Sequence, residues 1–241
     1  MPVGATIFSA SNDLHPRPAL PGRELRPPRF LLVGVAALLV AVSLSDLFAV
    51  YVGVRLYALL DGEEGVVLAS QQEVDEAYSL YETAGELQGY TFIACAIGFV
   101  IWFYGMRRYA GVLGPDRFRN GPGWAIGSWL IPLVHLWMPY RIAVDMWGAS
   151  TRLPVDGEQR KVSYWPVNLW WGLFVTENLF RRYAELRYQN AEDIAEIQSA
   201  VLQVLVADIL EVAAAAAAVH FAVRLTAMQR LKAAEGPYVS V

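Results

Sequence analysis

The chain has 241 residues, of which 56% are hydrophobic and 17% are charged, and its formal net charge is −4. This composition is too apolar for an ordinary soluble domain and is typical of an integral membrane protein. The single cysteine, Cys95, excludes an intramolecular disulfide, a C-x-x-C redox pair and a cysteine zinc site.

The two ends of the chain differ in composition from the middle. Residues 1–29 hold six of the thirteen prolines without apolar periodicity, so we expect a disordered, Pro-rich cytoplasmic tail. Residues 233–241 are expected to form a second cytoplasmic tail. The apolar run after residue 29 is too long for a signal peptide and lacks a cleavage site, which favours a retained helix. Residues 30–232 are therefore predicted to form a single transmembrane helical domain.

Four stretches are apolar over roughly the 20 residues that a helix needs to cross a bilayer. They are residues 30–52, 90–106, 164–180 and 204–223. The predicted fold is an all-α integral membrane helical bundle with four transmembrane helices.

Two of these helices are predicted to extend beyond the bilayer. A capping box at Ser70 and Glu73 and a stop at Gly114-Pro115 bound one helix of roughly 43 residues, or ~65 Å. Asn190 and Asp193 predict the start of another, which could run to Leu231. The first helix is expected to stop at Asp61-Gly62.

The predicted extensions are amphipathic and acidic. Their apolar stripes, expected to pack together outside the bilayer, are Val74, Ala77, Tyr78, Tyr81, Ala84 and Gln88, and Ala191, Ile194, Ala195, Gln198, Val201 and Leu202. The outer pieces contain twelve acidic residues and four arginines, so the exterior would attract cations. Two roles stay open for these stripes. They could form the core of a small helical ectodomain, or they could form a dedicated coiled coil with a membrane-protein partner or a second copy.

The segment from residue 124 to 147 is apolar but interrupted by prolines. If it dips into the membrane without crossing, fifteen of the nineteen positive charges lie on the cytoplasmic side; if it crosses, eleven do. The first count favours a re-entrant or interfacial half-helix, with both termini in the cytoplasm. A kinked true span is the alternative. The residues assigned to this interfacial region are Trp129, Pro132, His135, Trp137, Pro139, Trp170 and Trp171.

This same block carries a family resemblance. The run Gly127-x-Trp129-x-Ile131-Pro132-Leu133-Val134-x-Leu136-Trp137-x-Pro139, followed by Trp170-Trp171, resembles the uncharacterised bacterial family called domain of unknown function 4328. The resemblance extends over about residues 30 to 230. It implies a multi-pass membrane protein of a kind frequent in actinobacteria, and it implies no catalytic residues. The family usually has asparagine where this chain has His135.

Four acids lie within the predicted spans. In the four-span topology Asp46, Glu177, Asp208 and Glu211 all fall in the outer half of the bilayer. A charged acid at that depth is costly unless it is paired, and it marks a candidate site for a cation, a proton or a cationic ligand. The alternative is structural pairing, with Glu177 bonded to Arg181 one helical turn away and with Arg55 or Arg182 reaching other acids.

Other chemistry is poorly supported by the sequence. No P-loop, G-x-S-x-G, H-E-x-x-H or dinucleotide-binding motif is present, so no catalytic residue, metal ligand set or cofactor is predicted. His135 and His220 could in principle hold haem iron, but two scattered histidines are more often packing residues. The membrane topology and an attraction to anionic lipid account for the arginines of the short inner loops, so no nucleic-acid partner is predicted.

Three functions stay open from the sequence. The first is a non-enzymatic plasma-membrane module for sensing or scaffolding with an acidic helical exterior. The second is a small transporter or ion or proton conduit that uses the four acids. The third is a lipid-modifying enzyme, for which no nucleophile and base pair can be named. The bilayer is the one partner that every reading requires.

Overall fold

The computed structural model describes residues 27–60, 71–151 and 162–235, and these residues are almost entirely helical. The long helices are α1 (Arg29–Leu60), α3 (Gln71–Leu113), α6 (Trp165–Gln189) and α7 (Ile194–Glu235). Two short helices, α4 (Trp124–Leu130) and α5 (Met138–Ser150), are accompanied by the 3-10 turns η1 (Pro115–Arg117) and η2 (Val134–Leu136). The all-α prediction is confirmed. The predictions for residues 1–26 and 236–241 and for Ser70 lie outside the described residues.

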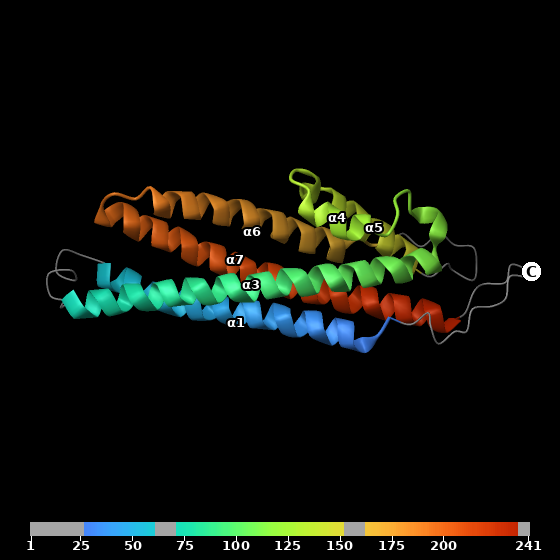
Figure 1. The fold of residues 1–241 in the computed structure, drawn as a ribbon, viewed down its shortest axis with the longest axis horizontal. Coiled ribbons are helices and arrows are strands. Elements are labelled where there is room, and N and C mark those ends of the chain that lie inside the picture. Colours follow the sequence, from blue (N-terminus) through green and yellow to red (C-terminus); the bar gives the residue numbers. More distant parts are fainter. Residues whose placement is uncertain (1–26, 61–70, 152–161, 236–241) are drawn as a thin grey trace, which may run out of the picture.

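The four long helices form an antiparallel bundle. Helix α1 packs along both α3 and α7, and α7 also packs along α6, so the helices follow one another in the order α3, α1, α7, α6 (Figure 1). The start of α1 and the ends of α3 and α7 lie together, and we call this the hairpin end because α4 and α5 lie near it. The opposite end, where α6 turns into α7, is the turn end.

The predicted lengths of the long helices agree with the structure. Helix α3 has 43 residues, the predicted number, and α1 ends at Leu60, next to the expected stop. Helix α7 has 42 residues and continues to Glu235, three residues past the predicted end of the domain. At 1.5 Å per residue, α3 and α7 are each ~60 Å long, about twice the thickness of a hydrocarbon core.

The start of α7 differs from the prediction. Helix α6 continues to Gln189, so Asn190 follows its last turn and does not cap α7. The cap is Asp193, whose Oδ1 accepts a hydrogen bond from the Glu196 backbone N–H at 2.7 Å. The Glu196 carboxylate in turn accepts a bond from the N–H of Glu192, the residue before the cap, at 3.0 Å, so the cap lies three residues later than expected.

The buried face of α7 agrees only in part with the predicted stripe. Val201 is buried as predicted, whereas Ile194 and Leu202 are 51% and 49% exposed. Leu205, which was not in the predicted stripe, is also buried, and Ile197 packs on these residues. The stripe predicted on α3 is confirmed, because Ala84 is buried and Ala77, Tyr78 and Tyr81 pack against buried residues of α1 and α7.

Among the described residues, three helices are long and apolar enough to cross a membrane: α1, α3 and α7. Helix α6, which contains the predicted third span, has 25 residues and could span by length. It is not among the three candidates, and its first part contains polar residues as well as Glu177, Arg181 and Arg182.

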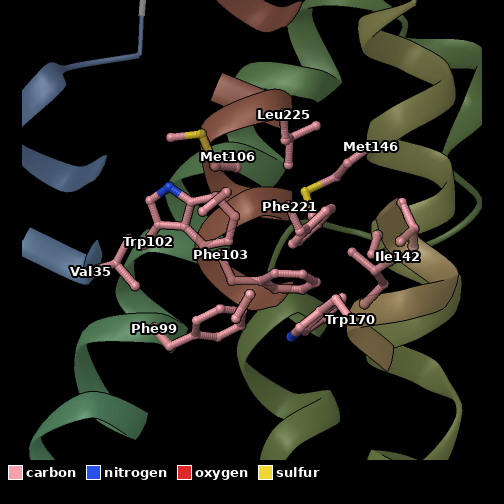
Figure 2. Close-up of a cluster of buried hydrophobic side chains, with 14 of the residues drawn as sticks. Val35, Phe99, Trp102, Phe103, Met106, Ile142, Met146, Trp170, Phe221 and Leu225 are labelled. Atoms are coloured by element: carbon pink, nitrogen blue, oxygen red, sulfur yellow. The ribbon is translucent and has the colours of Figure 1, made fainter. Parts of the chain in front are cut away.

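The hairpin half of the bundle contains an aromatic core. Trp102 and Phe103 of α3, Trp170 of α6 and Phe221 of α7 have at most 2% exposure and face one another (Figure 2). The Trp170 and Phe221 rings stack with centroids 4.6 Å apart and an interplanar angle of 5°. Trp170, assigned to the interfacial region from the sequence, is therefore a core residue. Its flat contact with Phe221 explains the difference.

The disputed segment is broken and does not form one straight helix. Helix α4 ends at Leu130, Pro132 follows in a turn, and Leu133 has a φ of 66°, a region that residues other than glycine rarely adopt. Pro139 stands in the first turn of α5, where its missing N–H costs nothing. The chain turns back here, so α4 and α5 form a hairpin that returns to the hairpin end (Figure 1).

Candidate functional site: a carboxylate cluster joining four helices

The four acids singled out in the sequence come together in the turn half of the bundle. Asp46 belongs to α1, Glu177 to α6, and Asp208 and Glu211 to α7. Two further side chains, Gln88 of α3 and Arg181 of α6, join them by hydrogen bonds. We call these six residues the carboxylate cluster. Each of the four long helices contributes to it.

Arg181 binds three of the four acids. Its Nε donates to Glu177 Oε1 at 2.7 Å, its Nη1 to Asp208 Oδ1 at 3.2 Å, and its Nη2 to Glu211 Oε2. The pairing of Glu177 with Arg181 one turn away was one of the two alternatives from the sequence. Arg182, also considered, pairs instead with the exposed Glu185 at 3.6 Å. The rigid guanidinium fork allows one side chain to reach carboxylates on two helices.

Gln88 connects the remaining acid to the cluster. Its Nε2 donates to Asp46 Oδ1 at 2.9 Å and to Asp208 Oδ1 at 3.0 Å. Asp46 is 1% exposed, and its other oxygen, Oδ2, is buried without a hydrogen-bond partner. Asp46 is thus the one acid of the four that has no ion pair at 4.0 Å or less within the described residues.

The cluster has more negative than positive charge. Four carboxylates against one guanidinium leave a formal charge of −3 when all of them are ionised. Carboxylates gathered in one hydrogen-bonded cluster repel one another strongly, and each uncompensated buried charge lowers the free energy of unfolding by several kcal/mol. Among the described residues, no three His, Cys, Asp or Glu side chains are grouped so that they could hold a metal ion. A proton on one carboxylate would reduce this excess of negative charge.

A cavity of about 510 Å³ adjoins the cluster. Gln88, Arg181, Asp208 and Glu211 line it, together with Gly85 and Gly89 of α3. The Gly-x-x-x-Gly spacing suggests a close helix contact, but a Cβ atom at either glycine would meet nothing within 4 Å. These glycines are exposed and leave room for the cavity.

The residues assigned to the interfacial segment separate in the structure. Trp129 packs edge-on against Phe99, Phe103 and Phe174, and Trp171 packs against Trp129, so both extend the aromatic core. Trp137 is 53% exposed, and Pro132 also lies on the surface. His135 is half-buried in η2. His220 lies against the Trp165 ring at 5.0 Å, with its Nε2 buried and without a hydrogen-bond partner.

Gln88 was not recognised as a site residue from the sequence, and Arg181 was recognised only in part. Gln88 was placed in an apolar stripe, where it was the one polar member, and that exception was the available signal. Arg181 was paired only with Glu177, because its contacts with Asp208 and Glu211 join residues 27 and 30 positions apart.

The model of one protein family, Domain of unknown function (DUF4328), matches residues 66–227. The chain belongs to this family. The matched range includes Gln88, Glu177, Arg181, Asp208 and Glu211, whereas Asp46 precedes it. The sequence resemblance is confirmed for this range, which is shorter than the expected 30 to 230. No curated protein and no solved structure matches the chain.

The three ion pairs of Arg181 predict that this side chain is essential for the stability of the fold. Arg181→Met would leave three buried carboxylates without their cation and should reduce the free energy of unfolding by about 3 kcal/mol or more. Arg181→Lys should lose less, because an ammonium keeps the charge but not the fork. Chemical unfolding of the purified protein in detergent measures both.

Arg182→Met is the matched control for this prediction. The Arg182 side chain is 70% exposed, so its loss should cost less than about 1 kcal/mol. Equal effects of Arg181→Met and Arg182→Met would show that the buried ion pairs do not stabilise the bundle.

Proposed function

We propose that this protein is a non-enzymatic sensing module of the plasma membrane, and that a proton bound at Asp46 is the signal it detects. The proposal combines a membrane topology with a chemical role for the carboxylate cluster. Its acidic helical exterior would concentrate cations, including protons, near the cavity.

In the proposed topology α6 is the third of four spans and both termini are cytoplasmic. Leu169 and Leu179 of α6 are 44% and 63% exposed, as expected of a helix with one face toward lipid. The hairpin would enter the inner half of the bilayer and return. Its exposed apolar residues Leu130 and Leu133 support this placement, because a water-exposed turn of this kind would be unfavourable. The fifteen-to-four distribution of positive charge supports the orientation.

The observation that carries the sensing role is the unpartnered Oδ2 of Asp46. Arg181 forms ion pairs with the other three acids, whereas Asp46 receives only the amide hydrogen bond from Gln88. A proton on Oδ2 would remove the least compensated charge of the cluster. Because Gln88 bridges Asp46 and Asp208, the bound proton would change the contacts of α3 with both α1 and α7.

A conduit is less well supported than a sensor. From Glu211 toward the hairpin end, the buried residues of α7 are alanines, Phe221 and Leu225 until Thr226, a distance of ~22 Å. Trp102, Phe103 and Trp170 pack against this stretch. No chain of buried polar side chains connects the cluster to the far end within the described residues, so a proton that enters would return by the same route.

The topology is tested by cysteine labelling in a Cys95→Ser background. Gly123→Cys lies before α4, at a position where an added Cβ meets nothing within 4 Å, and Glu192→Cys lies in the exposed turn between α6 and α7. An impermeant maleimide should label Glu192→Cys on intact cells and Gly123→Cys only after the cells are opened. Labelling of both from the same side would contradict this topology, because it would mean either that α6 does not cross or that residues 124–147 cross as well.

The sensing role predicts a dependence of stability on pH. If the folded state binds a proton that the unfolded state releases, the free energy of unfolding falls as pH rises, by up to about 1.4 kcal/mol per pH unit for one proton. The melting temperature of the wild type should therefore decrease between about pH 5 and pH 8. Asp46→Asn should make this dependence much weaker while it keeps the protein folded.

Two variants control this experiment. Glu86→Gln removes an exposed acid that does not line the cavity and should leave the pH dependence unchanged. Asp208→Asn should lower the melting temperature at every pH, because the amide keeps an acceptor oxygen but loses the charge that pairs with Arg181. An unchanged pH dependence in Asp46→Asn would exclude Asp46 as the proton site.

A further inference from the structure

A second cavity, of about 520 Å³, lies at the hairpin end and is lined mainly by polar residues. Its walls come from the last part of α3, the loop after it, and α4 and α5. Four arginines line it: Arg107, Arg117, Arg119 and Arg141. Asp116 and Asp145 are the acids in the lining, so the formal charge of the lining is +2. We call it the arginine pocket.

The arginines converge on one place. Burial raises the pKa of the Asp145 carboxyl on α5, and the positive charges of the four arginines act in the opposite direction. All four are therefore close enough to influence a single group. None of them forms an ion pair at 4.0 Å or less with an acid of the described residues, so their charges remain available to a ligand.

One of these arginines is held rigidly. Arg107 is 6% exposed, its guanidinium lies 3.5 Å from the centre of the Phe118 ring, and its Nη2 donates to the Asn120 carbonyl at 2.8 Å. A buried arginine fixed by a ring and a backbone carbonyl is a preorganised positive charge. The other lining arginines, Arg117, Arg119 and Arg141, are exposed and can adjust to a ligand.

The lining also has an apolar part. Trp124, 41% exposed, and Met138 border the same cavity as the arginines. Arginine recognises the oxygens of a phosphate by paired hydrogen bonds, and tryptophan favours the boundary between headgroups and acyl chains. A ligand that joins a phosphate to an apolar chain satisfies both parts of this lining.

The geometry points to the arginine pocket as a binding site for the phosphate group of an anionic phospholipid. This inference is independent of the carboxylate cluster, which lies in the other half of the bundle. It assigns a specific ligand to the arginines of the hairpin end, in addition to their proposed role in orienting the chain in the membrane.

The test uses the purified full-length protein in a neutral detergent. Its melting temperature is followed during titration with phosphatidylglycerol, with phosphatidylcholine and with inorganic phosphate. Phosphatidylglycerol should raise the melting temperature of the wild type, and the other two should have much smaller effects. A response to inorganic phosphate as large as that to phosphatidylglycerol would overturn the lipid assignment.

Variants locate the site. The double variant Arg119→Gln/Arg141→Gln removes two exposed arginines of the pocket and should weaken phosphatidylglycerol binding about ten-fold or more. Arg107 is left in place because its burial makes its loss a risk to folding. The matched control is Arg224→Gln, which removes an exposed arginine of α7 that does not line the pocket. Equal weakening by the control, or none by the double variant, would overturn the proposal.

Discussion

The compensation of buried acids by Arg181 is the interaction on which the turn half of the bundle depends. Helix α6 contacts α7 along its length, and the ion pairs of Arg181 with Asp208 and Glu211 stand at this contact. Without a cation, acids on α6 and α7 would repel one another across it. One arginine cannot balance four carboxylates, so the same constraint leaves Asp46 free for another positive charge. Stability and the proposed sensing thus have a common origin.

The two halves of the bundle are built in different ways. The turn half has polar side chains and a cavity opened by Gly85 and Gly89, whereas the hairpin half is closed by stacked rings such as those of Trp170 and Phe221. A closed aromatic half is suited to hold the helices in place while the cluster changes its protonation. The arginine pocket lies beyond this core, where the α4–α5 hairpin meets the end of α3.

The sequence allowed the helices and the acids to be predicted, because both depend on local signals. The stop at Gly114-Pro115 marks the end of α3 at Leu113, and the acids stood out as charges within apolar runs. The register of α7 was harder, since Asn190 and Asp193 carry the same type of capping signal and only the end of α6 decides between them.

The partners within the site could not be predicted in the same way. Gln88 and Asp208 are 120 positions apart, and no periodicity relates them. Trp170 shows a related difficulty: a tryptophan beside a predicted interface has the same sequence signature as one that stacks in a core. Packing between helices decided both cases.

The most direct measurement of the central claim is infrared difference spectroscopy of the protein in lipid nanodiscs between about pH 8 and pH 5. Protonation of Asp46 would produce a carboxylic-acid C=O band that is present in the wild type and in Glu86→Gln and absent in Asp46→Asn. A carboxylic-acid band of the same position and size in the wild type and in Asp46→Asn would contradict proton binding at Asp46.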